Sequence, residues 1–155
     1  MTGIAFTLNG SERAADVRAD TSLLTVLRGT YGLLSARETC GIGVCGSCSV
    51  LLDGEPVASC ILLAPMVDGR SVTTAESLDP DDPVLEAFAE AHAFQCGFCT
   101  PGFALTVKRL LEENPSPSVE ETTRALAGNL CRCGSYLKIL DAVELAARRL
   151  EAPSS

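Results

Sequence analysis

Eight cysteines form two quartets with different spacing, and these quartets constrain the chain more than any other feature. The first quartet, C-x4-C-x2-C-x11-C, consists of Cys40, Cys45, Cys48 and Cys60. The second, C-x2-C-x31-C-x-C, consists of Cys96, Cys99, Cys131 and Cys133. Four thiolates are the ligand set of a [2Fe–2S] cluster, and C-x4-C-x2-C…C is the plant-type ferredoxin spacing. The sequence therefore predicts two [2Fe–2S] clusters, one for each quartet.

The segment around the first three cysteines is rich in glycine. Gly41, Gly43 and Gly46 would let the backbone turn sharply, with its amides facing the sulfur atoms. Structural zinc is the alternative, although four-cysteine zinc sites usually use two CxxC pairs. In the second quartet, CxxC plus CxC suits zinc equally well, and CxxC alone could be a redox dithiol.

Charge and cysteine content limit the class of function. The 155 residues carry a formal net charge of −8, which argues against a nucleic-acid partner. No run approaches the ~18 apolar residues of a transmembrane helix. The N-terminal residues lack the basic and apolar regions of a signal peptide. Because eight cysteines as disulfides would be unusual in a reducing compartment, we expect metal ligands in a cytoplasmic protein.

The first half of the sequence shows the alternation of β-strands, beginning with Ile4, Phe6 and Leu8. Asn9-Gly10 and Asp53-Gly54 are typical of two-residue hairpin turns. The predicted elements are strands at 4–8 and 12–18, a helix at 23–27 capped by Asp20 or Thr21, and strands at 49–52, 56–59 and 70–74. Two hairpins around one helix indicate a β-grasp sheet.

The second half changes to a helical period after the proline-rich segment 79–83. The predicted helices are 84–91, a helix from Pro101 to Asn114 with Thr100 as N-cap, 118–128 with a capping box at Ser118 and Glu121, and 136–149. We expect residues 152–155 to fray. The predicted fold class is α+β, with a cluster domain at 1–78 and a helical cluster domain at 79–155.

Taken together, these motifs resemble the small iron–sulfur subunit of the molybdenum hydroxylase (xanthine oxidase/aldehyde oxidoreductase) family. The resemblance covers residues 3–150 and is carried by CGIGVCGSCSVLLDG, Ser59-Cys60, QCGFCTPG and GNLCRC. The last two motifs are highly specific, since ordinary ferredoxins have no second, helical cluster domain. The resemblance implies an N-terminal plant-ferredoxin-like β-grasp domain and a C-terminal four-helix bundle. The chain departs at Gly134-Ser135, where the family commonly has Thr-Gly before the tyrosine.

The resemblance also implies a function. The chain would be the electron-transfer subunit of a multi-subunit molybdenum hydroxylase, part of an oxidoreductase but not catalytic alone. It would carry electrons from a molybdopterin centre through two [2Fe–2S] clusters to FAD or another acceptor, with the helical-domain cluster nearer the molybdopterin. By the same resemblance, Gln95 and Cys133 would lie against the pterin.

The implied partners are a large subunit that binds molybdopterin in a dinucleotide form and a medium FAD-binding subunit, assembled as a heterotrimer or its dimer. Two other functions stay open at this point. One is a free-standing two-cluster ferredoxin, against which QCGFCTPG argues because a free carrier has no pterin to contact. The other is a zinc-stabilised interaction module.

Overall fold

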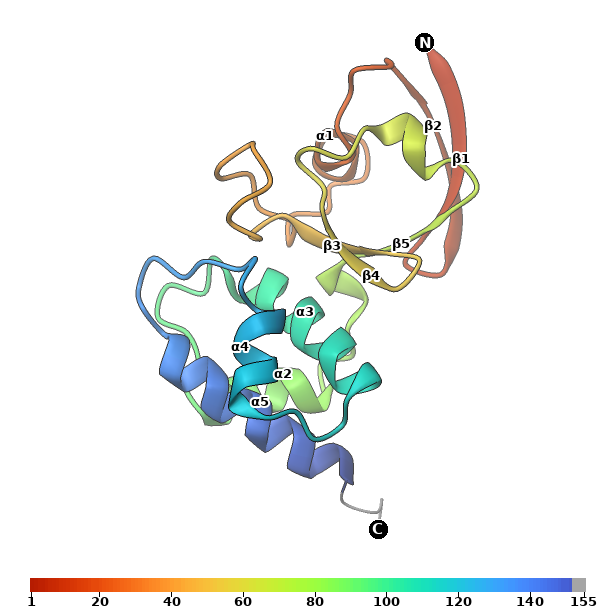
Figure 1. The fold of residues 1–155 in the computed structure, drawn as a ribbon. Coiled ribbons are helices and arrows are strands. Elements are labelled where there is room, and N and C mark those ends of the chain that lie inside the picture. Colours follow the sequence, from red (N-terminus) through yellow and green to blue (C-terminus); the bar gives the residue numbers. More distant parts are fainter. Residues whose placement is uncertain (152–155) are drawn as a thin grey trace.

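The computed structural model describes residues 1–151, and over these residues the chain is a mixed α/β protein. The strands are β1 (Thr2–Leu8), β2 (Ser11–Val17), β3 (Ser49–Leu52), β4 (Glu55–Ala58) and β5 (Ser71–Thr73). The helices are α1 (Leu23–Gly29), α2 (Pro83–Glu90), α3 (Thr100–Glu113), α4 (Val119–Ala125) and α5 (Tyr136–Glu151). Figure 1 shows the sheet and α1 in one half of the molecule and the other four helices in the other half. The predicted fraying of 152–155 lies outside the described residues.

The sheet has the order β2-β1-β5-β3-β4, and only β1 and β5 run parallel within it. Both predicted hairpins are confirmed. Asn9 and Gly10 have φ values of 51° and 78°, and Asp53 and Gly54 have 51° and 89°. Positive φ at both central residues matches the twist of a two-residue hairpin, and Asn, Asp and Gly accept that conformation most readily.

Helix α1 covers the sheet and closes the first core. Its buried leucines and Val26 pack with Ile4, Phe6 and Leu8 of β1. The predicted N-cap was wrong, because Ser22 caps this helix. Its Oγ accepts a hydrogen bond of 3.2 Å from the amide of Thr25. Asp20 and Thr21 lie too far before Thr25 for their side chains to accept this hydrogen bond.

Four helices follow the sheet and enclose a second core that includes Phe88, Phe103 and Ile139. Helix α5 lies along α2, and α3 contacts both α2 and α4. The predicted capping box of α4 is confirmed by reciprocal hydrogen bonds between Ser118 and Glu121. The predicted cap of α3 was wrong by one residue, since Thr100 already belongs to the helix. None of the helices within residues 1–151 is long and apolar enough to cross a membrane.

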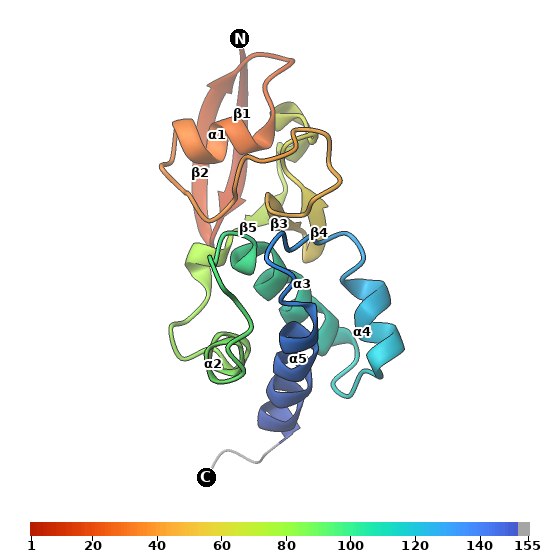
Figure 2. The same cartoon turned by 90° about the vertical axis from the view of Figure 1, so that its left-hand side faces the viewer.

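The two halves meet where α3 packs against β3 and β4. In Figure 2, α3 lies directly beneath these strands, between the sheet above and α5 below. Arg109 on α3 forms an ion pair of 2.7 Å with Glu55 on β4. This junction brings the loop before β3 close to the loops that precede α3 and α5. These three loops carry seven of the eight cysteines.

Candidate iron–sulfur centres

The first quartet is built by the loop that joins α1 to β3. Cys40, Cys45 and Cys48 lie in this loop, and Cys60 follows β4. The predicted need for glycine is confirmed, because Gly41, Gly43 and Gly46 have φ values of 67°, 77° and 69°. Gly43 also has no room for a side chain, since a Cβ there would lie 2.5 Å from Cδ1 of Ile61. The loop therefore folds tightly around its own cysteines.

Backbone amides point at the sulfur atoms of this quartet. Hydrogen bonds from the amides of Ile42 and Val44 lower the pKa of Cys40 to about 6. Burial, together with the neighbouring Cys48, raises the pKa of Cys60 to about 11, although the amide of Gly43 opposes that rise. Amide donors favour the thiolate, the form that binds metal, whereas a buried thiolate needs a cation to compensate its charge.

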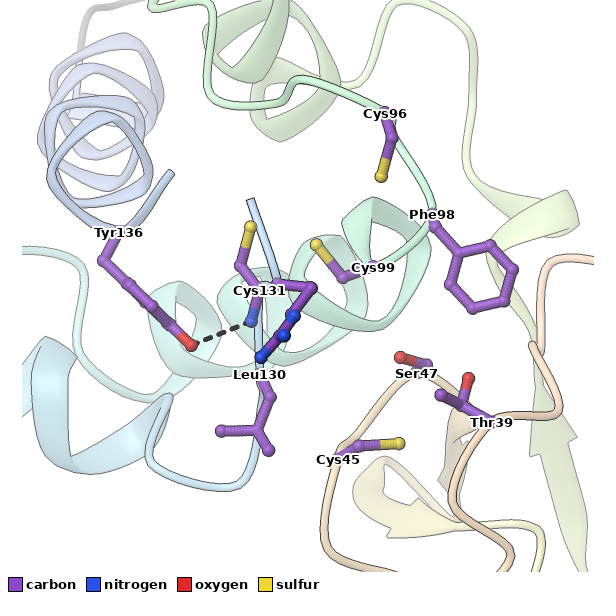
Figure 3. Close-up of a pocket in the computed structure, with 10 residues that line it drawn as sticks. Thr39, Cys45, Ser47, Cys96, Phe98, Cys99, Leu130, Cys131 and Tyr136 are labelled. Carbon is purple, nitrogen blue, oxygen red and sulfur yellow. Dashed lines mark hydrogen bonds between the residues drawn. The ribbon is translucent and has the colours of Figure 1, made fainter. Parts of the chain in front are cut away.

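The second quartet is assembled from two inter-helix loops. Cys96 and Cys99 precede α3, and Cys131 and Cys133 lie between α4 and α5. The Sγ atoms of Cys96 and Cys133 are 3.6 Å apart. Figure 3 shows the sulfur atoms of Cys96, Cys99 and Cys131 directed into one space. Residues 37 positions apart thus meet at one end of the helices.

Burial and hydrogen bonding act in opposite directions on the thiols of the second quartet. Burial raises the pKa of Cys99 to about 12, with Cys131 adding to the effect. The amide of Phe98 lowers the pKa of the exposed Cys96. Burial also acts to raise the pKa of Cys131, but the amide of Ser135, Cys99 and the side chain of Ser135 together bring it below its ordinary value. As in the first quartet, buried thiols are combined with backbone donors.

Within each quartet the thiols are arranged as two pairs. The interacting pairs are Cys40 with Cys45, Cys48 with Cys60, Cys96 with Cys133, and Cys99 with Cys131. A [2Fe–2S] cluster has two irons, and four cysteines therefore divide two to each iron. Zinc would instead draw all four sulfurs to ~2.3 Å around one ion. The donor set fits the cluster.

Gln95 and Cys133, which the resemblance placed against a pterin, lie together. The Nε2 atom of Gln95 donates a hydrogen bond of 3.2 Å to the backbone carbonyl of Cys133. The Gln95 side chain is exposed. Its amide can therefore form further hydrogen bonds to a partner, since a primary amide offers two donors and an acceptor.

The Gly134-Ser135 segment, where the sequence departs from the family's usual Thr-Gly, forms a well-defined turn. Gly134 has a φ of 80°, and the amide of Ser135 donates to Sγ of Cys131 at 3.4 Å. The hydroxyl of Tyr136 accepts a hydrogen bond of 2.9 Å from the amide of Cys131, as drawn in Figure 3. Ser135 is 6% exposed, so its hydroxyl is enclosed next to the sulfur. Sequence reasoning assigned no role to this serine.

A cavity of about 430 Å³ lies between the two quartets. Its lining includes Cys45 from the first and Cys96, Cys99 and Cys131 from the second. The amide of Leu130 donates a 2.9 Å hydrogen bond to the carbonyl of Cys45, so the two cysteine loops are joined directly. Sequence reasoning also missed Asn129, which adjoins this contact. Its place in GNLCRC was the available signal.

Both halves match known families. Residues 6–77 match the 2Fe-2S iron-sulfur cluster binding domain, and residues 74–144 match the [2Fe-2S] binding domain. Two iron–sulfur-binding domains therefore follow one another along the chain.

Similar proteins extend the match over nearly the whole chain. The chain is 45% identical to the nicotinate dehydrogenase small FeS subunit of Eubacterium barkeri, over 94% of this chain and 95% of that protein. It is 47% identical to the nicotine 6-hydroxylase small subunit of Paenarthrobacter nicotinovorans, over 88% and 84%. A chain of quinoline 2-oxidoreductase from Pseudomonas putida 86 superposes with a TM-score of 0.90 at 40% identity, covering 97% and 98%. The chain therefore belongs to the small iron–sulfur subunits of the molybdenum hydroxylase family.

Proposed function

We propose that this chain is the electron-transfer subunit of a multi-subunit molybdenum hydroxylase and is not catalytic on its own. The observation that carries the proposal is the division of eight cysteines into two quartets, each with paired thiols, beside one cavity that members of both quartets line. Membership of the family of small iron–sulfur subunits supports it. The partner would be a large molybdenum-binding subunit, and the acceptor would be FAD in a medium subunit or another electron acceptor.

Each quartet would hold one [2Fe–2S] cluster, which when bound accepts and releases a single electron. Cys40, Cys45, Cys48 and Cys60 would ligate the first cluster, and Cys96, Cys99, Cys131 and Cys133 the second. The amides of Ile42, Val44 and Ser135 would donate to ligand sulfurs and stabilise the added negative charge. The loop at Gln95 would face the molybdopterin, in a dinucleotide form, of the large subunit.

We further interpret the two halves as domains. Residues 1–78 would form a plant-ferredoxin-like β-grasp domain and residues 79–155 a four-helix bundle. The separate cores around Phe6 and Phe103 support this division. The assembly would be a heterotrimer or its dimer. We also propose a cytoplasmic location, because a reducing compartment would keep the eight cysteines reduced and available to bind metal.

Metal analysis and cysteine variants test the proposal. The purified chain should contain about four irons and about four acid-labile sulfides, because each cluster holds two of each. Cys48→Ser should lose the first cluster and Cys131→Ser the second, so each variant should keep about half of the iron. The paramagnetic signal that survives should differ between the two variants, because the quartets differ in burial and amide donors.

The alternatives predict other results. Zinc without iron would overturn the proposal in favour of an interaction module. A free two-cluster ferredoxin would contain the same iron, but it would purify without a large partner. The apolar side chains exposed around the second quartet argue against that alternative, since Phe94, Phe98 and Leu130 are 43%, 41% and 50% exposed.

A further inference from the structure

The loops that carry the two quartets meet at a buried contact made by Gly46, Gly102 and Asn129. The carbonyl oxygen of Gly46 approaches α3 so closely that a Cβ on Gly102 would lie 2.2 Å from it. A Cβ on Gly46 would in turn lie 2.6 Å from Nδ2 of Asn129. Gly46 also has a φ of 69°. Because neither position has room for a side chain, the backbone of the first loop lies directly against the second half of the molecule.

Asn129 uses both ends of its side-chain amide at this contact. Its Nδ2 donates to the carbonyl of Gly46 at 3.4 Å. Its Oδ1 is 3.3 Å from the hydroxyl oxygen of Thr106, whose single proton is shared between Oδ1 and the nearer carbonyl of Gly102 at 2.9 Å. Asn129 is 5% exposed and Thr106 is 7% exposed. A buried polar group is costly unless it is hydrogen-bonded, so this network strongly favours one arrangement of the two loops.

The contact adjoins one predicted ligand of each quartet. Gly46 follows Cys45, and Asn129 lies two residues before Cys131. The residue between, Leu130, donates its amide to the carbonyl of Cys45 at 2.9 Å. Figure 3 shows Leu130 beside both Cys45 and Cys131 at the cavity between the quartets. Any shift of the Asn129 contact would therefore move one ligand loop relative to the other.

We propose that Asn129 is a positioning residue which, with Thr106, Gly46 and Gly102, fixes the separation of the two cluster-binding loops and so the electronic contact between the clusters. This inference rests on the proposed function, because it requires both quartets to hold clusters. Asn129 itself would touch no cluster. It acts through the Leu130–Cys45 hydrogen bond and the backbone of Gly46.

The test uses the assembled complex and three variants. Asn129→Ala removes the whole amide, and Thr106→Val removes the hydroxyl while keeping its shape. Thr123→Val is the matched control. Like Thr106, Thr123 donates its hydroxyl to the carbonyl four residues earlier, here at 2.7 Å, but Thr123 lies on the exposed face of α4. Iron, sulfide and the reduction potential of each cluster are measured first. The magnetic interaction between the two reduced clusters is then read from their paramagnetic spectra, since it weakens steeply with separation.

Asn129→Ala and Thr106→Val should retain their iron and both individual signals but lose part of the magnetic splitting. Electron exchange between the clusters should slow several-fold, while Thr123→Val should match the wild type. Unchanged splitting in both variants, with full iron, would overturn the inference and leave the proposed function intact. A wild-type chain without iron would overturn both. If Asn129→Ala does not assemble, the splitting of Thr106→Val decides the inference.

Discussion

At the scale of single residues, Ser135 distinguishes the second quartet of this chain. The amide of Ser135 is 3.4 Å from Sγ of Cys131, and the Ser135 side chain also acts to lower the pKa of that thiol. A donor at a ligand sulfur stabilises the reduced cluster, which carries one more negative charge. Ser135→Ala should therefore lower the reduction potential of the helical-domain cluster. A neutral hydrogen bond is worth ~1 kcal/mol, which corresponds to a few tens of millivolts for one electron.

A redox titration that follows each paramagnetic signal separately measures this shift. Ser116→Ala, in the loop before α4, is the control and should change neither potential. The potential of the Cys40 cluster should also stay constant in Ser135→Ala, because Ser135 adjoins only the second quartet among these sites. An equal shift of both clusters would instead indicate a general change in the fold and contradict a local hydrogen bond.

At the scale of elements, local sequence rules predicted whatever depends on near neighbours. Asn9-Gly10, Asp53-Gly54 and the Ser118–Glu121 capping box were read correctly, because each is determined within four residues. The N-cap predicted for α1 was wrong, since Asp20, Thr21 and Ser22 are all good N-cap residues and the sequence does not distinguish Ser22, which caps the helix. The Asn129–Gly46 contact joins residues 83 positions apart, so no periodicity could indicate it.

The start of α2 depends on one buried carboxylate. Asp82 is 6% exposed, caps α2 through a 2.9 Å bond from the amide of Val84, and accepts a 2.6 Å bond from Lys108 on α3. Asp82→Ala should lower the free energy of unfolding by ~2–3 kcal/mol, because it removes a cap and a charged hydrogen bond together. Ser118→Ala, which removes only an exposed cap, should cost ~1 kcal/mol. Denaturant unfolding of both variants measures the difference, and equal losses would contradict a role for Lys108.

At the scale of the whole molecule, the cysteine spacing predicts two ligand sets but does not indicate how they are joined. The four predicted ligands of each quartet lie near one another in the structure. What connects the quartets is the packing of α3 beneath β3 and β4. That packing places the backbone of Gly46 directly against the backbone of Gly102. Because neither residue has a side chain, no hydrophobic periodicity in the sequence indicates the contact.

Exposed apolar side chains surround the second quartet and indicate where a partner subunit would bind. They include Phe94, Phe98, Leu130, Tyr136 and Leu137. Leu137, in the first turn of α5, is 77% exposed and lies four residues from Cys133. If the large subunit covers this surface, Leu137→Glu would bury a carboxylate against apolar groups, which costs several kcal/mol. Co-purification with the large subunit should therefore weaken by at least about tenfold, since each ~1.4 kcal/mol is a factor of ten.

Leu150→Glu is the matched control for that variant. It makes the same change on the same helix, at a residue that is 50% exposed, and ~20 Å away at 1.5 Å per residue. Both variants should keep the full iron content, because neither side chain lies in a core. Loss of assembly in Leu137→Glu alone would place the large subunit over the Cys133 end of α5, beside Gln95. If Leu150→Glu lost assembly and Leu137→Glu did not, the partner would cover the far end of α5, too distant for Gln95 to contact a pterin.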